Sequence, residues 1–167
     1  EAAPRLVLIP TWQCELRCRY CVIPKQTGRV MSLETARDGI RFLLSSSRND
    51  LILQFFGGEA LLEWELVREC IRYGHEQAVK LGKDLSFILS SNGMSIDAGR
   101  LEWLSNYPVK LELSLDGDSD TQNRFRRALK KGEDSYAEGI GPKASMIQSA
   151  GLPYDVIMVV HPENAFK

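Results

Sequence analysis

The feature that most constrains the fold of this chain is a repeated alternation between strand patterns and helix patterns. Short apolar runs with strand character occur at residues 5–10, 51–56, 85–90, 109–115 and 154–160. Amphipathic segments with helical spacing follow the first four of these runs. Strands that alternate with helices form a parallel sheet with right-handed crossovers. The sequence therefore predicts an α/β fold, either a doubly wound sheet or a (β/α) barrel.

Local signals predict where two of the helices begin and end. A long helix is expected over residues 62–81, and its inward stripe includes Cys70, which we interpret as a core residue. Further along, Ser135 and Glu138 have the spacing of a capping box. The helix that they begin is expected to end near Gly151.

Composition excludes several classes of protein. The chain has 167 residues, 44% of them hydrophobic and 26% charged, which is typical of one globular domain spanning residues 1–167. The formal net charge is −1, so no overall field favours nucleic acid or an anionic membrane surface. No apolar run approaches the roughly 18 residues that a membrane helix requires, and the first residues lack a signal-peptide pattern. We therefore expect a cytoplasmic protein.

Unusual polar residues gather where the expected strands end. In both candidate folds, ligands bind beyond the carboxyl ends of parallel strands. The segments at that edge are residues 11–21, 57–59, 91–93, 114–117 and 161–164. Because these segments meet at one edge of the sheet, the sequence predicts a single functional site there.

Three cysteines in the first of these segments have the spacing C-x3-C-x2-C, and they are Cys14, Cys18 and Cys21. Three thiolates can bind three irons of a 4Fe–4S cluster and leave the fourth iron open to a ligand. A structural zinc site requires four ligands, and no fourth Cys or His lies within the usual short spacing. A zinc-binding structural domain and a non-catalytic iron–sulfur module for electron transfer or scaffolding remain as alternatives.

With the aromatic residue Tyr20 before the third cysteine, this motif resembles that of the radical SAM superfamily. The resemblance implies that the cysteines hold a 4Fe–4S cluster whose open iron binds S-adenosylmethionine, near which Tyr20 is expected. It also implies reductive cleavage of that cofactor to a 5′-deoxyadenosyl radical, which abstracts hydrogen from a substrate. The implied fold is a partial (β/α)6 barrel, of which about five parallel strands are expected here, incomplete at the C-terminal end.

The resemblance extends to a Gly-Gly-Glu segment after the second expected strand, formed by Gly57, Gly58 and Glu59. In the family, the carboxylate of this segment accepts a hydrogen bond from the methionine ammonium group of the cofactor. Glycine lets backbone approach a ligand closely, and a fixed carboxylate suits a cation. These three residues are therefore expected to bind the cofactor.

Further cofactor-binding residues follow from the same resemblance. Ser114 and Asp116 match a family motif at the end of the fourth expected strand, where they would contact the ribose hydroxyls. Ser91 and Asn92 resemble the segment that follows the third strand, and Arg126 matches a family arginine near the methionine carboxylate. The sequence assigns no catalytic acid or base.

The set of motifs looks most like the peptide- and protein-modifying branch, the sulfatase maturases and SPASM-type enzymes. Gln122 and Asn123 depart from the branch's His-Asp pair, which weakens any role for that pair. The basic run over residues 124–131, apart from Arg126, is interpreted as a solvated helix face. The resemblance implies a peptide or protein substrate and a reduced flavodoxin or ferredoxin as electron donor. A further chain segment or a partner is expected to complete the barrel.

Overall fold

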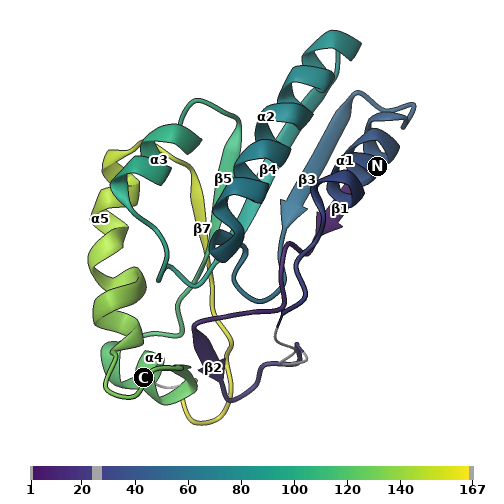
Figure 1. Cartoon of the computed structure of the whole chain (residues 1–167). Coiled ribbons are helices and arrows are strands. Elements are labelled where there is room, and N and C mark those ends of the chain that lie inside the picture. The colour runs from purple at the N-terminus through teal and green to yellow at the C-terminus, as the bar shows by residue number, and fades with distance from the viewer. Residues whose placement is uncertain (1, 24–27, 166–167) are drawn as a thin grey trace.

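The computed structural model describes residues 2–23 and 28–165, and it contains a five-stranded sheet in which all neighbouring strands are parallel. The strand order is β1-β3-β4-β5-β7 (Figure 1). The strands are β1 Arg5–Leu8, β3 Asp50–Phe55, β4 Asp84–Ser91, β5 Val109–Ser114 and β7 Tyr154–Ile157. The predicted α/β fold with five parallel strands is confirmed.

Helices cover one face of this sheet. The helices that pack on this face are α1 Leu33–Leu44, α2 Trp64–Leu81, α3 Ala98–Leu104 and α5 Gly141–Ser149. The described part of the chain also contains η1 Ala60–Glu63, α4 Ser119–Phe125 and η2 Ser135–Ile140. Residues of α1, α2, α3 and α5 share a single buried cluster with alternate residues of the strands, such as Leu51, Leu53 and Phe55 of β3. Because successive residues of a strand point to opposite faces, the other face is left for the interior of a barrel. The one-sided arrangement favours the barrel over the doubly wound sheet.

Several local expectations are confirmed. The long helix ends at Gly82, whose φ of 66° requires the left-handed conformation that glycine adopts readily. Cys70 of α2 is 1% exposed and belongs to the hydrophobic core, as predicted. None of the helices in the described part of the chain is long and apolar enough to cross a membrane.

The predicted capping box at Ser135 is wrong by one residue. The cap is Asp134, whose side chain accepts hydrogen bonds from the backbone N–H groups of Tyr136 and Ala137. Ser135 is fully buried, and its hydroxyl donates to the side chain of Asn123 instead. Glu138 still takes part in the cap, since its Oε1 accepts a hydrogen bond from Asp134 N. Ser135 does not cap the helix because its hydroxyl is engaged by Asn123 of α4.

A short antiparallel ribbon joins β2 Leu16–Cys18 to β6 Arg126–Ala128, and the sequence did not predict it. Strands of three residues are too short to show a periodic pattern. The interpretation of residues 124–131 as one solvated helix face is wrong, because α4 ends at Phe125 and the chain continues as β6. The ribbon connects the cysteine segment to Arg126.

The last strand, β7, lies at the edge of the sheet and pairs with β5. Its apolar residues are half exposed, with Val156 and Ile157 each 46% accessible to solvent. Parallel strands are normally covered on both faces, so this edge is unusually apolar for its exposure.

Candidate functional site

A cavity of about 420 Å³ lies beyond the carboxyl ends of β3, β4 and β5, next to the ribbon of β2 and β6. Figure 1 shows β2 and α4 beyond that end of the sheet. The predicted site residues that line the cavity are Cys14, Cys18, Tyr20, Cys21, Gly57, Gly58, Ser91, Asn92, Ser114 and Arg126. The fold thus brings Cys14 and Arg126, which are 112 positions apart in the sequence, to the same cavity. Glu59 and Asp116 do not line the cavity and are buried beside it.

The three clustered thiols differ in exposure, since Cys14 and Cys18 are half-buried and Cys21 is exposed. Cys14 Sγ accepts hydrogen bonds from Leu16 N at 3.3 Å and from Asn92 Nδ2 at 3.5 Å. Burial raises the pKa of Cys14 to about 12. Burial also raises the pKa of Cys18, against a lowering by Arg126. A metal centre would reverse these shifts, because coordination stabilises thiolates.

Gly57 and Gly58 let the cysteine segment approach the end of β3. Gly58 N donates to Thr11 O at 3.0 Å, and the next backbone N–H donates to Gln13 O at 2.7 Å. A Cβ atom on Gly58 would lie 2.0 Å from Gln13 O, and Gly57 has a φ of 125°. Any side chain at Gly58 would therefore displace the backbone immediately before Cys14.

Glu59 is 1% exposed, and its carboxylate is already occupied by protein donors. Oε1 accepts from Leu61 N at 3.1 Å and from Ser91 Oγ at 3.0 Å, while Oε2 accepts from Asn92 N at 2.8 Å. Burial raises the pKa of Glu59 to about 7, although the backbone donors oppose the shift. In this structure Glu59 caps η1 and positions Ser91 and Asn92, so it supports the cavity wall from behind.

Asp116 is the second carboxylate behind the cavity, at 2% exposed. Its Oδ1 accepts from Arg126 Nη2 at 3.1 Å and from Val159 N at 3.0 Å, and its Oδ2 accepts from the Tyr20 hydroxyl. The Arg126 guanidinium lies 5.4 Å from the centre of the Tyr20 ring. Burial and the hydrogen bond to Asp116 raise the pKa of Tyr20. Asp116 therefore orients the two residues that face the cavity.

Gln122 was not assigned a role from the sequence, yet it is fully buried beside this group. Its Oε1 accepts from Asp116 N at 2.9 Å, and its Nε2 donates to Ser114 O at 3.4 Å. Asn123 joins α4 to η2 by accepting from Ser135 Oγ and donating to Asp134 Oδ1, both at 2.8 Å. Both amides are positioning residues, and the signal in the sequence was their place at the positions of the branch's His-Asp pair.

The donor set fits a 4Fe–4S cluster. Within residues 2–23 and 28–165, no three His, Cys, Asp or Glu side chains converge so as to hold one metal ion. A cluster does not require such convergence, because each thiolate binds a different iron. Arg126 lines the same cavity as the thiols, and its buried Nε has no hydrogen-bond partner in the described part of the chain. Beside three thiolates, a guanidinium that keeps one N–H group without a partner among the described residues suits a group of net negative charge, although its Nη2 is already paired with Asp116.

Comparison with known proteins places this site in context. A family model described as the radical SAM superfamily matches residues 8–165. The chain is 26% identical over 164 residues to an uncharacterized protein of Methanocaldococcus jannaschii, covering 98% of this chain and 55% of that protein. It is also 26% identical over 158 residues to the radical SAM cyclopropyl synthase TigE of Paramaledivibacter caminithermalis, covering 84% of this chain and 32% of the synthase. The chain thus spans about half or less of these relatives.

The fold is also similar to solved structures of anSMEcpe. The structure with bound AdoMet and the Cp18Cys peptide superposes with a TM-score of 0.84 at 21% identity, covering 95% of this chain and 44% of anSMEcpe. A second structure, with bound AdoMet alone, gives a TM-score of 0.82 at 22% identity, covering 94% of this chain. At this level of identity the likeness establishes a shared fold.

Proposed function

Because the chain belongs to the radical SAM superfamily, we propose that it binds a 4Fe–4S cluster through Cys14, Cys18 and Cys21 and binds S-adenosylmethionine in the adjoining cavity. When bound, the cluster supplies one electron for reductive cleavage of the cofactor, which yields a 5′-deoxyadenosyl radical for hydrogen abstraction from a substrate. We propose that residues 1–167 form the core domain for this chemistry.

One observation carries this proposal. The three thiols face the same cavity as Gly57 and Gly58, the ends of β4 and β5, and Arg126. These elements are remote from one another in the sequence, and only the parallel topology places their carboxyl ends together. The cavity is of the size of small-ligand sites, which are typically about 300–1,000 Å³.

The residues around the cavity have distinct roles in the proposal. Gly58 permits close approach of the backbone that precedes Cys14, and this holds the cysteine segment at the cavity where the cofactor would bind. Ser114 and Ser91 line the cavity, and Ser114 would contact the ribose together with Asp116. Arg126 has a free Nε and suits the methionine carboxylate. Glu59 would act mainly through Ser91 and Asn92, with its remaining acceptor capacity open to an ammonium group.

We propose a peptide or protein as the substrate. The support is that anSMEcpe, which shares this fold, has been solved with a bound peptide. A reduced flavodoxin or ferredoxin is the proposed electron donor, since the cleavage consumes one electron that no described residue supplies. Both proposals concern the whole protein, and the chain covers only part of its relatives.

Anaerobic reconstitution followed by a dithionite-driven cleavage assay tests the proposed function. We expect about four irons and four sulfides per chain, as a 4Fe–4S cluster contains, and release of 5′-deoxyadenosine from S-adenosylmethionine. Cys14→Ala is expected to lose the cluster, whereas Cys70→Ala, the matched control in the core of α2, is expected to keep it. A protein that holds the cluster but releases no 5′-deoxyadenosine would instead be an electron-transfer or scaffold module. Zinc in place of iron would point to a structural domain.

A further inference from the structure

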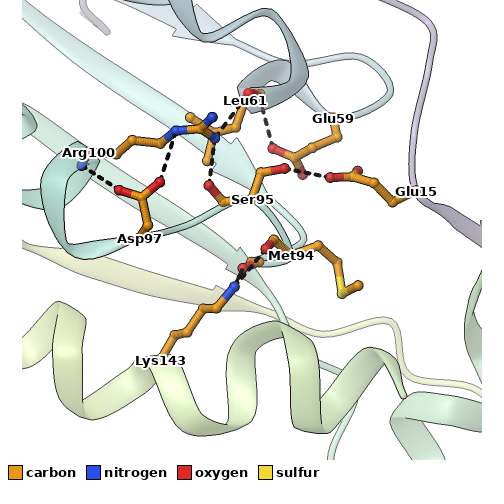
Figure 2. Close-up of polar contacts among 9 residues, drawn as sticks. Glu15, Glu59, Leu61, Met94, Ser95, Asp97, Arg100 and Lys143 are labelled. Carbon is orange, nitrogen blue, oxygen red and sulfur yellow. Dashed lines mark hydrogen bonds and ion pairs between the residues drawn. The ribbon is translucent and has the colours of Figure 1, made fainter. Parts of the chain in front are cut away.

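The residue after Cys14, Glu15, has a carboxylate to which the proposed function assigns no role. Across residues 2–23 and 28–165, no Lys, Arg or His side chain forms an ion pair with it. Neutral donors hold it instead, since Ser95 Oγ donates to Oε1 at 2.6 Å and Asn92 Nδ2 donates to Oε2 at 3.3 Å. Figure 2 shows Ser95 and Glu15 pointing toward each other. A carboxylate is therefore held next to the first thiol by neutral donors, and the Lys143 ammonium acts on it electrostatically without forming an ion pair.

The side-chain amide of Asn92 connects this charge to the sulfur of Cys14. Its Oδ1 accepts from Met94 N at 2.8 Å, which turns Nδ2 toward the cysteine segment. There Nδ2 lies 3.5 Å from Cys14 Sγ and 3.3 Å from Glu15 Oε2. One donor thus serves both the sulfur and the carboxylate, and their relative position is set by a single amide.

The backbone that carries Asn92 and Ser95 is itself held by cations. Lys143 Nζ donates to Gly93 O at 2.8 Å and to Met94 O at 2.6 Å. Arg100 Nη1 donates to Ser95 O at 2.6 Å (Figure 2). Three successive carbonyl groups of this loop are therefore fixed by side chains from α3 and α5. A loop held in this way keeps the Glu15 carboxylate in a fixed position relative to Cys14 Sγ, because Ser95 and Asn92 bind it.

We propose that Glu15 lowers the reduction potential of the cluster bound at Cys14, and that Ser95 and Asn92 hold the carboxylate in the position from which it does so. Charge near the cluster and hydrogen bonds to its sulfurs set such potentials. A fixed negative charge disfavours the reduced state, which carries one more electron. The inference rests on the proposed function, because it requires the cluster to bind. The electron comes from the reduced flavin or iron–sulfur protein proposed as donor.

The chemical benefit follows from the cleavage reaction. One-electron reduction of a sulfonium breaks a carbon–sulfur bond, with one electron of that bond left on carbon and a thioether as the other product. Electron transfer to the sulfonium is more favourable from a centre of lower potential. Glu15 and the N–H···S contact from Asn92 act in opposite directions, since a donor to sulfur stabilises the more negative, reduced state.

A redox titration of the reconstituted protein tests the inference, with the cluster followed by optical or electron paramagnetic resonance spectra. Glu15→Gln removes the charge and keeps the size of the side chain. We expect its potential to rise so that the ratio of reduced to oxidised cluster at a fixed ambient potential increases about tenfold, which is 59 mV for a one-electron couple. Glu65→Gln, an exposed position of α2 paired with Arg68, is the control and is expected to leave the potential unchanged.

Two further variants distinguish an effect of charge on the potential from an effect of the substitution on the structure. Ser95→Ala frees one oxygen of Glu15 and is expected to raise the potential by less than Glu15→Gln does. Asn92→Asp adds a charge and removes the donor to sulfur, so the potential should fall. A purely structural role would not shift Glu15→Gln and Asn92→Asp in opposite directions.

The outcomes also distinguish this inference from the proposed function. An intact cluster whose potential is the same in Glu15→Gln and in the wild-type protein overturns the inference alone. A wild-type protein that binds no cluster overturns both. Iron and sulfide content, measured for every variant, identifies a variant that has lost the site, and Ser95→Ala then replaces Glu15→Gln as the deciding measurement.

Discussion

Two buried carboxylates lie behind the cavity wall, and their partners differ. Within residues 2–23 and 28–165, Glu59 is 1% exposed and its donors are all neutral, namely two backbone N–H groups and the Ser91 hydroxyl. Asp116, 2% exposed, is paired with the Arg126 guanidinium. Burial raises the pKa of Glu59 to about 7, whereas Asp116 has a cation to balance its charge. The comparison shows two ways to keep a carboxylate behind a ligand site, with different sensitivities to pH and to mutation.

The largest expected effect comes from removing the cation beside Asp116. Arg126→Met leaves a buried carboxylate without its charged partner, and breaking such a pair costs about 3–5 kcal/mol of unfolding free energy. Arg127→Met, at the next and exposed position of β6, is the matched control and should change stability by less than about 0.5 kcal/mol. Urea unfolding at pH 7 measures both. Equal losses in the two variants would show that Asp116 does not depend on the pair.

The second prediction concerns the pH dependence of stability on the Glu59 side. The pKa of Glu59 rises from its ordinary value of 4.5 in the unfolded chain to about 7 in the folded one. The folded state therefore binds the proton more tightly, and stability falls as pH rises from 4.5 through 7. Since one pKa unit corresponds to 1.36 kcal/mol, the loss is at most about 3 kcal/mol.

Glu59→Gln should remove this component, because the amide does not titrate. The measurement is the difference in unfolding free energy between variant and metal-free wild-type protein from pH 4 to pH 8. Glu65→Gln, on the exposed surface of α2, provides the control for a lost carboxylate. A difference curve that is flat across this range would show that burial does not hold the proton on Glu59.

A smaller effect is expected at Gln122, on the Asp116 side. Gln122→Met leaves the Asp116 backbone N–H and the Ser114 carbonyl without their side-chain partner. An unsatisfied buried polar group costs about 1–3 kcal/mol. Gln148→Met, at an exposed position of α5, is the control. Thermal unfolding compares the two, and equal melting temperatures would contradict the positioning role of Gln122.

The smallest effect is expected at Ser91, on the Glu59 side. Ser91→Ala removes one of three donors to Glu59 and the acceptor for Gly93 N. A single neutral hydrogen bond contributes about 0.5–1.5 kcal/mol. Loss of a donor to the carboxylate should also raise the pKa of Glu59 further, and this would appear as a shift of the pH profile to higher pH. An unshifted profile would mean that the backbone donors alone hold Glu59.

The sequence was sufficient for the main elements of the fold. Strand runs and helical spacing gave the five parallel strands, and the stripe containing Cys70 is buried in α2 as predicted. It missed the β2–β6 ribbon and misplaced one cap, at Ser135. Both errors arise where a contact between remote segments outweighs the local pattern.

Some features of the candidate site could likewise be predicted from the sequence, and others could not. The residue types and spacings around Cys14, Gly57 and Ser114 could be read directly, because turns and metal ligands leave local signatures. The spacing did not show that Glu59 and Asp116 lie behind the cavity wall, or that Gln122 holds the turn before Asp116. Burial and hydrogen-bond partners depend on which segments pack together.

The sequence by itself determined that the chain forms alternating strands and helices with three thiols and several polar turns at one edge of a parallel sheet. Hydrophobic periodicity and turn chemistry are local properties, so they can be predicted from the sequence. The tertiary structure decided which carboxylate received a cation, since Arg126, which pairs with Cys18 in the ribbon, also forms an ion pair with Asp116. It also decided that neutral donors, and not an ion pair, hold Glu15 beside Cys14, because its partner Ser95 lies 80 residues away in the sequence.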